Sequence, residues 1–353
     1  MIIECVSVQQ LKRRLLLLTL IFMISNIVSQ AQNLIPNPSF EQYKKLHCEW
    51  IRAIVGGTAQ DHKKTFDSLL YDWVEADDGG GVELFSALVS PGCYKASNIC
   101  NTSFYCTTNP VSIGAFPKDG NNICLISLLN LYKLQYNGRA YLQTPLLSKL
   151  TSGSHYLAGL YTMLPNTYYG DFACNNLGMF FSPKAVGTYT PSNSYLISEK
   201  PQVNQEQVNT DHGVWKKIFG CFTANGDEQY LTLGNFYDNE HTEVQLIVPH
   251  YDLGSDFATY VVDSVFTEEV KNPFIPNVFT PNGDGQNEKF VIKDIHSGWW
   301  SLTVVNRWGK QVYFSNDYRN TWNGGDLNSG VYYYVLQHRC REINYKGSLT
   351  ILR

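Results

Sequence analysis

Short runs of β-branched and aromatic residues, separated by turns rich in Gly, Asn and Asp, recur along this 353-residue chain. Examples are Tyr156–Tyr161, Trp215–Phe222, Gln229–Phe236 and Val331–Leu336. No segment after residue 31 has the apolar period of a strong amphipathic helix. Aromatic residues make up 14% of the chain and charged residues only 16%, which is typical of packed strands joined by polar turns. These observations predict an all-β fold.

The first residues have the pattern of an export signal. Lys12, Arg13 and Arg14 precede the uncharged run Leu15–Val28, which is shorter than the roughly 20 residues of a membrane span. Small residues at Ser29 and Ala31 then fit a cleavage site before Gln32. We predict a signal peptide over residues 1–31, with an uncleaved membrane anchor as the alternative. No later stretch is long and apolar enough to span a membrane, so we expect none in the mature chain.

Charge and motifs exclude several function classes. The net charge is −4 and the isoelectric point is about 6.1, whereas a nucleic-acid-binding protein needs a basic face. The sequence contains no H-E-x-x-H, G-x-S-x-G or P-loop motif, and its histidines are scattered. We therefore expect no enzyme. A divergent glycoside hydrolase stays open, because paired carboxylates meet only in space.

Eight cysteines follow the signal segment, and export to an oxidising compartment favours disulfides among them. The four within Cys93–Cys124 lack the paired C-x2-C spacing of a zinc site, which favours a stapled loop over a metal knuckle. Only Cys340 lies near the C-terminus. Either one thiol stays free or a bridge joins two domains. The eight are Cys48, Cys93, Cys100, Cys106, Cys124, Cys174, Cys221 and Cys340.

A linker divides the mature chain near residue 271. The β-rich run Tyr260–Phe266 is followed by charged residues and then by Pro273 and Pro276. We predict one domain over residues 32–271 and a second over residues 272–353. The second block alternates short strands with Gly-containing turns, which predicts a small antiparallel β-sandwich.

The second block carries five ordered motifs of a known family. They are Ile275–Gly285, Val304–Val312, Trp322–Gly324, Ser329–Tyr333 and Lys346–Arg353. In these motifs the block resembles the gliding motility-associated C-terminal domain of exported Bacteroidota proteins, although Glu288 stands where the family commonly has Asp. The resemblance implies recognition by the type IX secretion machinery, and release or display at the outer cell surface. The alternative is an accessory β-domain without a sorting role.

A Gly-rich loop in this block has the oxygen-bearing side chains that a calcium site needs. Asn282, Asp284, Asn287 and Glu288 place oxygens at short intervals. The register and the distal bidentate Glu of an EF-hand are missing. The alternative is a turn in which Asn and Asp side chains accept backbone hydrogen bonds.

For the larger block, residues 32–271, the alternating strand-like runs predict a large jelly-roll-like β-sandwich. Segments Asn37–Glu41 and Tyr260–Val265, at its two ends, resemble the first and last strands of carbohydrate-binding-module-like jelly rolls. In such modules a Glu from the first strand and an Asp from the last bind structural calcium, which here implies Glu41 and Asp263. The alternative is that both carboxylates face solvent or cap the backbone.

Sugar binding needs exposed aromatic rings that stack on sugar C–H faces. Tyr168 and Tyr169, adjacent on a turn, are the best candidates, and Trp50 and Trp73 are weaker ones; core or edge packing is the alternative for each. We predict an exported binding protein whose sandwich binds glycan. A structural cell-envelope protein with protein–protein contacts is the second interpretation. An exposed aromatic strip would favour glycan, a flat apolar patch a protein partner, and a cleft with facing carboxylates a hydrolase.

Overall fold

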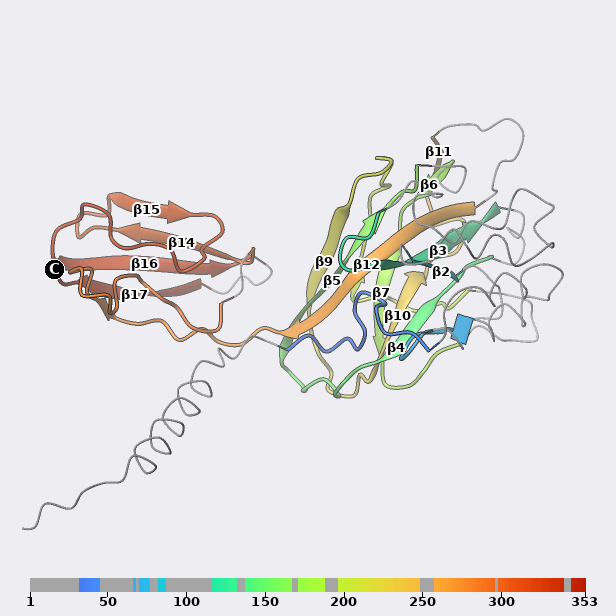
Figure 1. Ribbon diagram of the computed structural model, residues 1–353, viewed down its shortest axis with the longest axis horizontal. Coiled ribbons are helices and arrows are strands. Elements are labelled where there is room, and N and C mark those ends of the chain that lie inside the picture. The colour runs from blue at the N-terminus through green and yellow to red at the C-terminus, as the bar shows by residue number, and fades with distance from the viewer. Residues whose placement is uncertain are drawn as a thin grey trace, which may run out of the picture. The chain divides into compact units, whose positions relative to one another are not determined.

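The computed structural model describes residues 32–44, 66–67, 70–76, 82–86, 116–131, 137–166, 171–187, 196–247, 257–295, 298–339 and 344–353. They fall into two compact units, Asn33–Val270 and a unit that contains Lys271–Arg353. The described elements are strands throughout, so the prediction of an all-β chain is confirmed (Figure 1). Within these residues, no helix has the length and apolar character needed to cross a bilayer.

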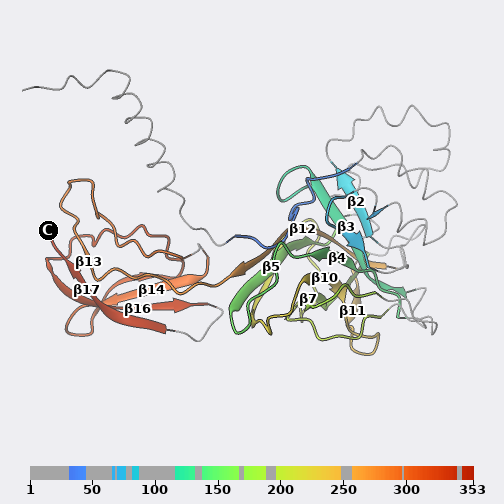
Figure 2. The same ribbon diagram turned by 90° about the horizontal axis from the view of Figure 1, so that it is seen from below.

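The N-terminal unit contains two five-stranded antiparallel sheets. The first sheet has the order β1 (Val74–Glu75), β4 (Leu142–Pro145), β10 (Tyr230–Asn235), β7 (Leu177–Ser182) and β8 (Val203–Asn204). The second has the order β2 (Val82–Ser86), β3 (Asn122–Asn130), β12 (Phe257–Glu269), β5 (His155–Met163) and β9 (Lys216–Thr223). β6 (Phe172–Cys174) and β11 (Val244–Leu246) pair separately. Figure 2 shows β4, β10 and β7 side by side in one layer.

The main core lies between these two sheets because their strands alternate apolar and polar faces. Met179 and Leu231 from the first sheet and Leu160 and Val262 from the second belong to one buried cluster. The outer face of the first sheet is covered by the chain itself. There, buried Ile197 packs with Tyr141 and Phe236, and the Tyr141 hydroxyl accepts a 3.0 Å bond from the Ile197 N–H.

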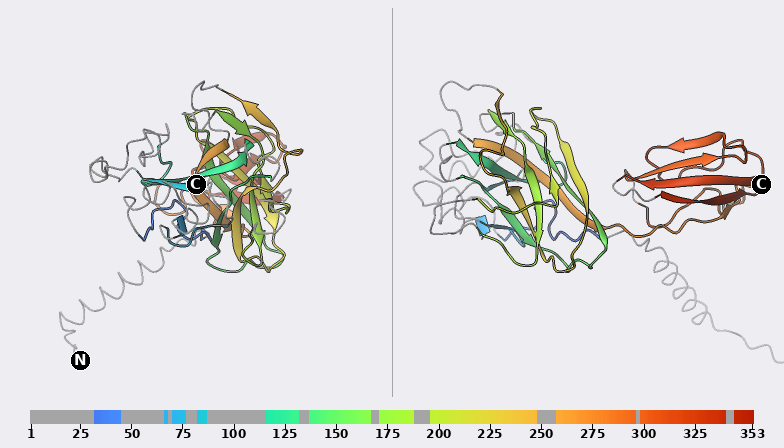
Figure 3. Two further views of the ribbon diagram at one scale, coloured as in Figure 1. Left: turned by 90° about the vertical axis from the view of Figure 1, so that its right-hand side faces the viewer. Right: turned by 180° about the vertical axis from the view of Figure 1, so that it is seen from behind.

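The C-terminal unit has one five-stranded sheet (Figure 3). Its order is β13 (Val278–Phe279), β17 (Asn344–Ile351), β16 (Gly330–His338), β14 (Trp300–Val305) and β15 (Gln311–Ser315). The β13–β17 pair is parallel and the other pairs are antiparallel. Aromatic packing builds the core on one side of this sheet, where Trp322 lies 5.5 Å from Phe279 and 4.8 Å from Tyr313 between ring centroids.

Candidate functional site

Two carboxylates hold the loop that leads into β3. Glu41 Oε1 accepts hydrogen bonds from the backbone N–H groups of Asn121 and Asn122, both at 2.7 Å. Asp263 Oδ2 accepts bonds from the N–H groups of Lys118 at 2.8 Å and Asp119 at 3.0 Å. We call this arrangement the carboxylate clamp. It ties segments from the start, the middle and the end of the N-terminal unit to one another.

Local backbone geometry brings both carboxylates to this loop. The register of β12 against β5 shifts between Asp263 and Phe266, and Ser264 at the shift has a positive φ of 50°. Its N–H binds Asp263 Oδ1 at 2.6 Å. Gly120 has a φ of +66°, which favours glycine, and a Cβ there would lie 2.4 Å from Glu41 Cδ, so a larger residue would displace the Glu41 carboxylate from the loop.

Burial dominates the electrostatics of the clamp. Asp263 is fully buried, and this desolvation raises its pKa to about 6 even though three backbone N–H groups bind the carboxylate. The Asn122 Oδ1 atom is also buried and has no hydrogen-bond partner. Glu41 Oε2 makes no hydrogen bond to another described residue. A buried oxygen acceptor without a partner, such as Asn122 Oδ1, is the type of ligand atom that a hard cation such as Ca²⁺ prefers.

In the structure, the carboxylates of Glu41 and Asp263 accept hydrogen bonds from backbone N–H groups. Such capping was the alternative interpretation of these two residues. Both carboxylates bind the same loop, residues 118–122, which was not foreseen from sequence. Among the described residues, no group of three or more His, Cys, Asp or Glu side chains is arranged to hold a metal ion. Calcium at the clamp therefore stays a prediction.

The loop over Asn282–Glu288 in the C-terminal unit makes local turn contacts. Glu288 Oε1 accepts bonds from the Gly283 and Gly285 N–H groups at 2.7 and 3.1 Å. Asp284 Oδ1 accepts a 2.7 Å bond from the N–H of Gln286. Asn282 Oδ1 accepts a bond from the N–H of Asp284 at 3.1 Å, and the Asn287 backbone carbonyl accepts one from the N–H of Thr280 at 2.9 Å. These contacts match the turn interpretation, and calcium here also stays a prediction.

Of the four residues that the sequence suggested for stacking on sugar, the structure describes one. Tyr168, Tyr169 and Trp50 lie outside the described residues. Trp73 is fully buried, its Nε1–H donates a 2.9 Å bond to the Asn37 carbonyl, and its ring lies 5.2 Å from that of Phe40. Trp73 is therefore a core residue, as its alternative interpretation held.

The outer face of the second sheet carries three aromatic side chains that sequence reasoning missed. β12, β5 and β9 are neighbours, and Phe266 pairs with Gly159, which pairs with Phe219. Tyr161 lies two residues further along β5 on the same face. The Phe266 ring lies over Gly159, where a Cβ would be 2.6 Å from it. We call Tyr161, Phe219 and Phe266 the aromatic strip.

Two lysines accompany the aromatic strip. Lys118 Nζ lies 4.8 Å from the Tyr161 ring centroid. Lys217 Nζ lies 5.8 Å from the same centroid and 4.6 Å from that of Phe266. Partial desolvation by the neighbouring rings lowers the pKa of Lys217, and the nearby carboxylate of Glu268 opposes this shift. Cation–π contacts hold both ammonium groups against the rings.

The aromatic strip is open to solvent. Phe219 is 46% exposed, Tyr161 and Phe266 are half-buried, and both lysines are exposed. An exposed aromatic ring can stack on the ring of a ligand, and an adjacent ammonium group can pair with a negatively charged substituent of that ligand. The alternation of apolar residues in β5 predicts two faces, but it does not tell which one the rest of the chain leaves uncovered.

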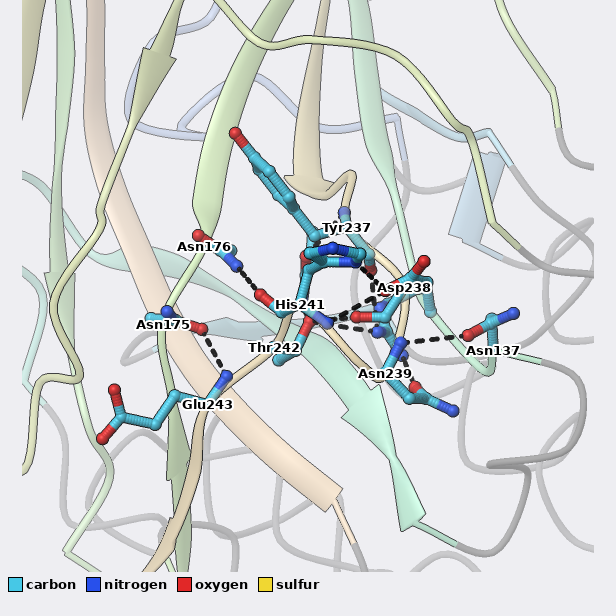
Figure 4. Close-up of polar contacts among 11 residues, drawn as sticks. Asn137, Asn175, Asn176, Tyr237, Asp238, Asn239, His241, Thr242 and Glu243 are labelled. Atoms are coloured by element: carbon cyan, nitrogen blue, oxygen red, sulfur yellow. Dashed lines mark hydrogen bonds and ion pairs between the residues drawn. The ribbon is translucent and has the colours of Figure 1, made fainter.

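A polar network anchors the connection between β10 and β11 (Figure 4). The Arg139 guanidinium, 3% exposed, donates to the Tyr237 carbonyl at 2.8 Å and to Asn239 Oδ1 at 3.0 Å. Asn176 Nδ2 donates to the His241 carbonyl at 2.9 Å, and the exposed His241 and Asp238 side chains pair at 2.6 Å. These contacts are mostly to backbone groups, so this network positions a loop.

Among the described residues of the N-terminal unit two cysteines are free, where the sequence argument allowed for one. Cys124 on β3 and Cys174 on β6 are buried free thiols within the main core, and Cys221 is disulfide-bonded. Burial raises the pKa of both thiols, that of Cys174 to about 12. Free cysteine in a core packs as a small apolar residue, which explains why these two need no partner.

Comparisons with known proteins assign part of the chain. No curated protein matches it. Two solved structures show weak likeness, namely the enzymatically active domain of tailspike protein 4 from bacteriophage CBA120 and the BSP domain of a biofilm associated protein. Identities are 6% and 9% and TM-scores 0.27 and 0.14, over 67% and 65% of this chain. The chain spans 21% and 49% of the length of these two structures.

A family model identifies the C-terminal part. Residues 274–351 match the CHU_C type IX secretion signal domain. The matched span contains β13 to β17, so the motif resemblance and the fold agree. Residues 274–351 therefore form a type IX secretion signal domain, which directs export of the protein through the type IX secretion machinery.

Proposed function

We propose that this protein is an exported binding protein, displayed on the cell surface or released, whose N-terminal unit binds glycans that carry negative charge. The observation that supports the binding role is the aromatic strip with its two lysines. The secretion signal domain supports delivery to the cell exterior. This domain is a sorting element, so the specific activity of the protein is assigned to the N-terminal unit.

The chemistry of the strip favours a sugar ligand over an apolar one. Phe219 offers an exposed ring on which the C–H face of a pyranose can stack. Lys118 and Lys217 stand beside it, held against Tyr161 and Phe266. An ammonium group pairs with a uronate carboxylate or a sulfate ester. An acidic polysaccharide offers both a C–H face that can stack on Phe219 and negative charge that can pair with the lysines.

A binding screen on an array of acidic and neutral glycans tests this proposal, with the full mature chain as the probe. We expect Phe219→Ala to weaken binding to the best acidic glycan about tenfold, because loss of the apolar area buried by the ring costs on the order of 1.5 kcal/mol. We expect Lys118→Gln with Lys217→Gln to weaken acidic ligands selectively. Tyr71→Ala is the matched control, since Tyr71 is 49% exposed, has Lys44 Nζ 5.5 Å from its ring centroid, and lies outside the strip.

The same screen separates the other interpretations. Unchanged binding in the strip variants, together with loss in Tyr168→Ala with Tyr169→Ala, would move the site to the turn predicted from sequence. Absence of glycan binding by the unmodified chain would contradict the glycan proposal and favour a protein partner. Hydrolysis of an array glycan would favour the hydrolase interpretation.

Deletion of residues 272–353 tests delivery. Because residues 274–351 are the secretion signal domain, we expect the truncated chain to accumulate in the periplasm. Fractionation of the native host followed by immunoblotting measures this. Normal surface or medium levels of the truncated chain would contradict the role of this domain in sorting.

We also propose that the carboxylate clamp binds a structural calcium ion. Glu41, Asp263 and Asn122 Oδ1 would hold it, since the two carboxylates bind the loop and the Asn122 oxygen is buried there without a hydrogen-bond partner. We expect calcium to raise the melting temperature of the mature chain above its value in chelator, and Asp263→Asn to abolish the difference. Equal melting temperatures with calcium and with chelator would rule out the ion.

A further inference from the structure

The tip of the β14–β15 hairpin exposes a tryptophan. Trp308 is 78% exposed, the highest value among the large hydrophobic side chains of the described residues. Transfer of an aromatic side chain from water into an apolar pocket is strongly favourable, so a Trp as exposed as this one is available for binding. Apart from Arg307, no other ring or cation is in contact with its ring among the described residues.

The turn that carries Trp308 is tightly hydrogen-bonded. Asn306 Oδ1 accepts bonds from the N–H groups of both Trp308 and Lys310 at 3.0 Å. The backbone closes the turn a second time, because Gly309 N–H donates to the Asn306 carbonyl and Asn306 N–H donates to the Lys310 carbonyl, both at 2.9 Å. The backbone is therefore ordered before any partner binds, which lowers the entropy cost of association.

Positive charge surrounds this tryptophan. The Arg307 guanidinium lies 4.8 Å from the Trp308 ring centroid, and Lys310 is exposed in the same turn. The chain from Trp300 to Asn316 contains no acidic residue. The next acid, Asp317, is paired with Arg319 at 2.6 Å. The tip thus combines an aromatic ring with two cations.

The sheet face next to the tip is apolar and open. Phe314 is 55% exposed, Tyr333 48% and Val331 52%. Phe314 pairs with Thr303, and Tyr333 pairs with Val305 two residues further along β14, so these side chains share the face opposite the core. No described residue of the C-terminal unit covers this face in a hydrophobic cluster.

We propose that the hairpin tip, residues 306–310, together with this open face, is the surface by which the type IX secretion machinery recognises the signal domain. Residues 274–351 belong to a domain whose partner is that machinery, and Trp and Arg are the residue types that dominate the binding energy of protein interfaces. The receiving surface on the machinery is an apolar pocket with carboxylates at its rim, because Arg307 and Lys310 flank the inserted ring. This inference goes beyond the glycan proposal and does not depend on it.

The test is secretion of the full chain from its native host. We expect Trp308→Ala to lower the ratio of exported to periplasmic protein at least about tenfold, as removal of an interface hot spot does. Trp308→Phe keeps a ring and restores most of the export. Arg307→Glu reverses the charge and lowers export more than Arg307→Gln. Phe274→Ala is the matched control, since Phe274 is 63% exposed and has Lys293 Nζ 5.7 Å from its ring centroid.

Melting of each purified variant separates recognition from folding. Because Trp308 is exposed, we expect Trp308→Ala to melt at the temperature of the unmodified chain. Export of Trp308→Ala at the unmodified level would overturn the proposal. Loss of export accompanied by a lowered melting temperature, or an equal loss in Phe274→Ala, would overturn it as well, because the defect would then lie in folding or in general surface change.

Discussion

Two turns of this protein are each held by one glutamate oxygen, yet they differ in what they connect. Glu41 Oε1 accepts two backbone N–H groups that are 80 and 81 residues away. Glu288 Oε1 also accepts two, but they are five and three residues away. The long-range pair joins separate segments of a sandwich beside the buried Asp263, whereas the short-range pair only orders an exposed loop.

The same hydrogen-bond pattern therefore stabilises the fold by different amounts in the two turns, depending on burial. Leaving a buried N–H without an acceptor costs about 1–3 kcal/mol, while an exposed N–H turns to water at little cost. We therefore expect substitutions in the carboxylate clamp to lower the free energy of unfolding far more than substitutions in the Asn282–Glu288 loop. Four predictions, from the largest expected effect to the smallest, test this difference.

Asp263→Ala should have the largest effect. It removes the acceptor for the N–H groups of Lys118, Asp119 and Ser264 at a fully buried position. We expect a loss of about 3–5 kcal/mol in the free energy of unfolding, measured by urea denaturation in chelator. Asp284→Ala, in the exposed loop, is the control and should lose less than about 1 kcal/mol. Equal losses would remove the distinction between the two turns.

Gly120→Ala comes next, with Gly283→Ala as its counterpart. Both glycines have positive φ, +66° and +87°, but a Cβ at Gly120 would meet Glu41 at 2.4 Å, whereas nothing lies within 4 Å of one at Gly283. We expect a loss of about 2–4 kcal/mol for Gly120→Ala and about 1 kcal/mol for Gly283→Ala in the same denaturation assay. The cost of placing Ala at a positive φ is common to both variants. The difference between their losses in the free energy of unfolding therefore measures how closely Glu41 packs against residue 120.

Glu228→Gln tests an intermediate case, a turn that is local but buried. Burial alone would raise the pKa of Glu228, but bonds from the N–H groups of Asn225, Gly226 and Asp227 lower it below 4.5. This carboxylate therefore stabilises the fold above pH 4.5, and the contribution disappears as pH falls through the lowered pKa. We expect Glu228→Gln to lose about 1 kcal/mol at pH 7 and nothing near pH 2. A loss that is independent of pH would contradict the role of the charge.

Glu288→Gln should have the smallest effect. The amide oxygen still accepts from Gly283 and Gly285, and water reaches both N–H groups. We expect a change in the free energy of unfolding within about 0.5 kcal/mol. A larger loss that calcium reverses would instead support the metal interpretation of this loop.

The local features were predictable from sequence. Alternating β-rich runs and Gly turns indicated the all-β fold, and ordered motifs after residue 271 indicated the secretion signal domain. The turn at Asn282–Glu288 could also be anticipated, because its hydrogen bonds join residues at most five apart.

Residues whose role depends on distant partners were not predictable. Trp73 could have been a surface ring until the Asn37 carbonyl and the Phe40 ring were found around it. The burial of Arg139 could not be predicted from sequence, because its acceptors lie about a hundred residues away. Likewise, Phe219 and Phe266 become neighbours only through β5, with which both strands pair.

The amino-acid sequence by itself determined the class of secondary structure, the position of the sorting domain and the chemistry of its turns. Propensity, apolar alternation and Asn–Gly turn chemistry act over a few residues, so they can be read in one dimension. The tertiary structure decided which sheet face stays open, which carboxylates are buried and which loop they hold. Those outcomes depend on strand order and register, which bring together residues far apart in the chain.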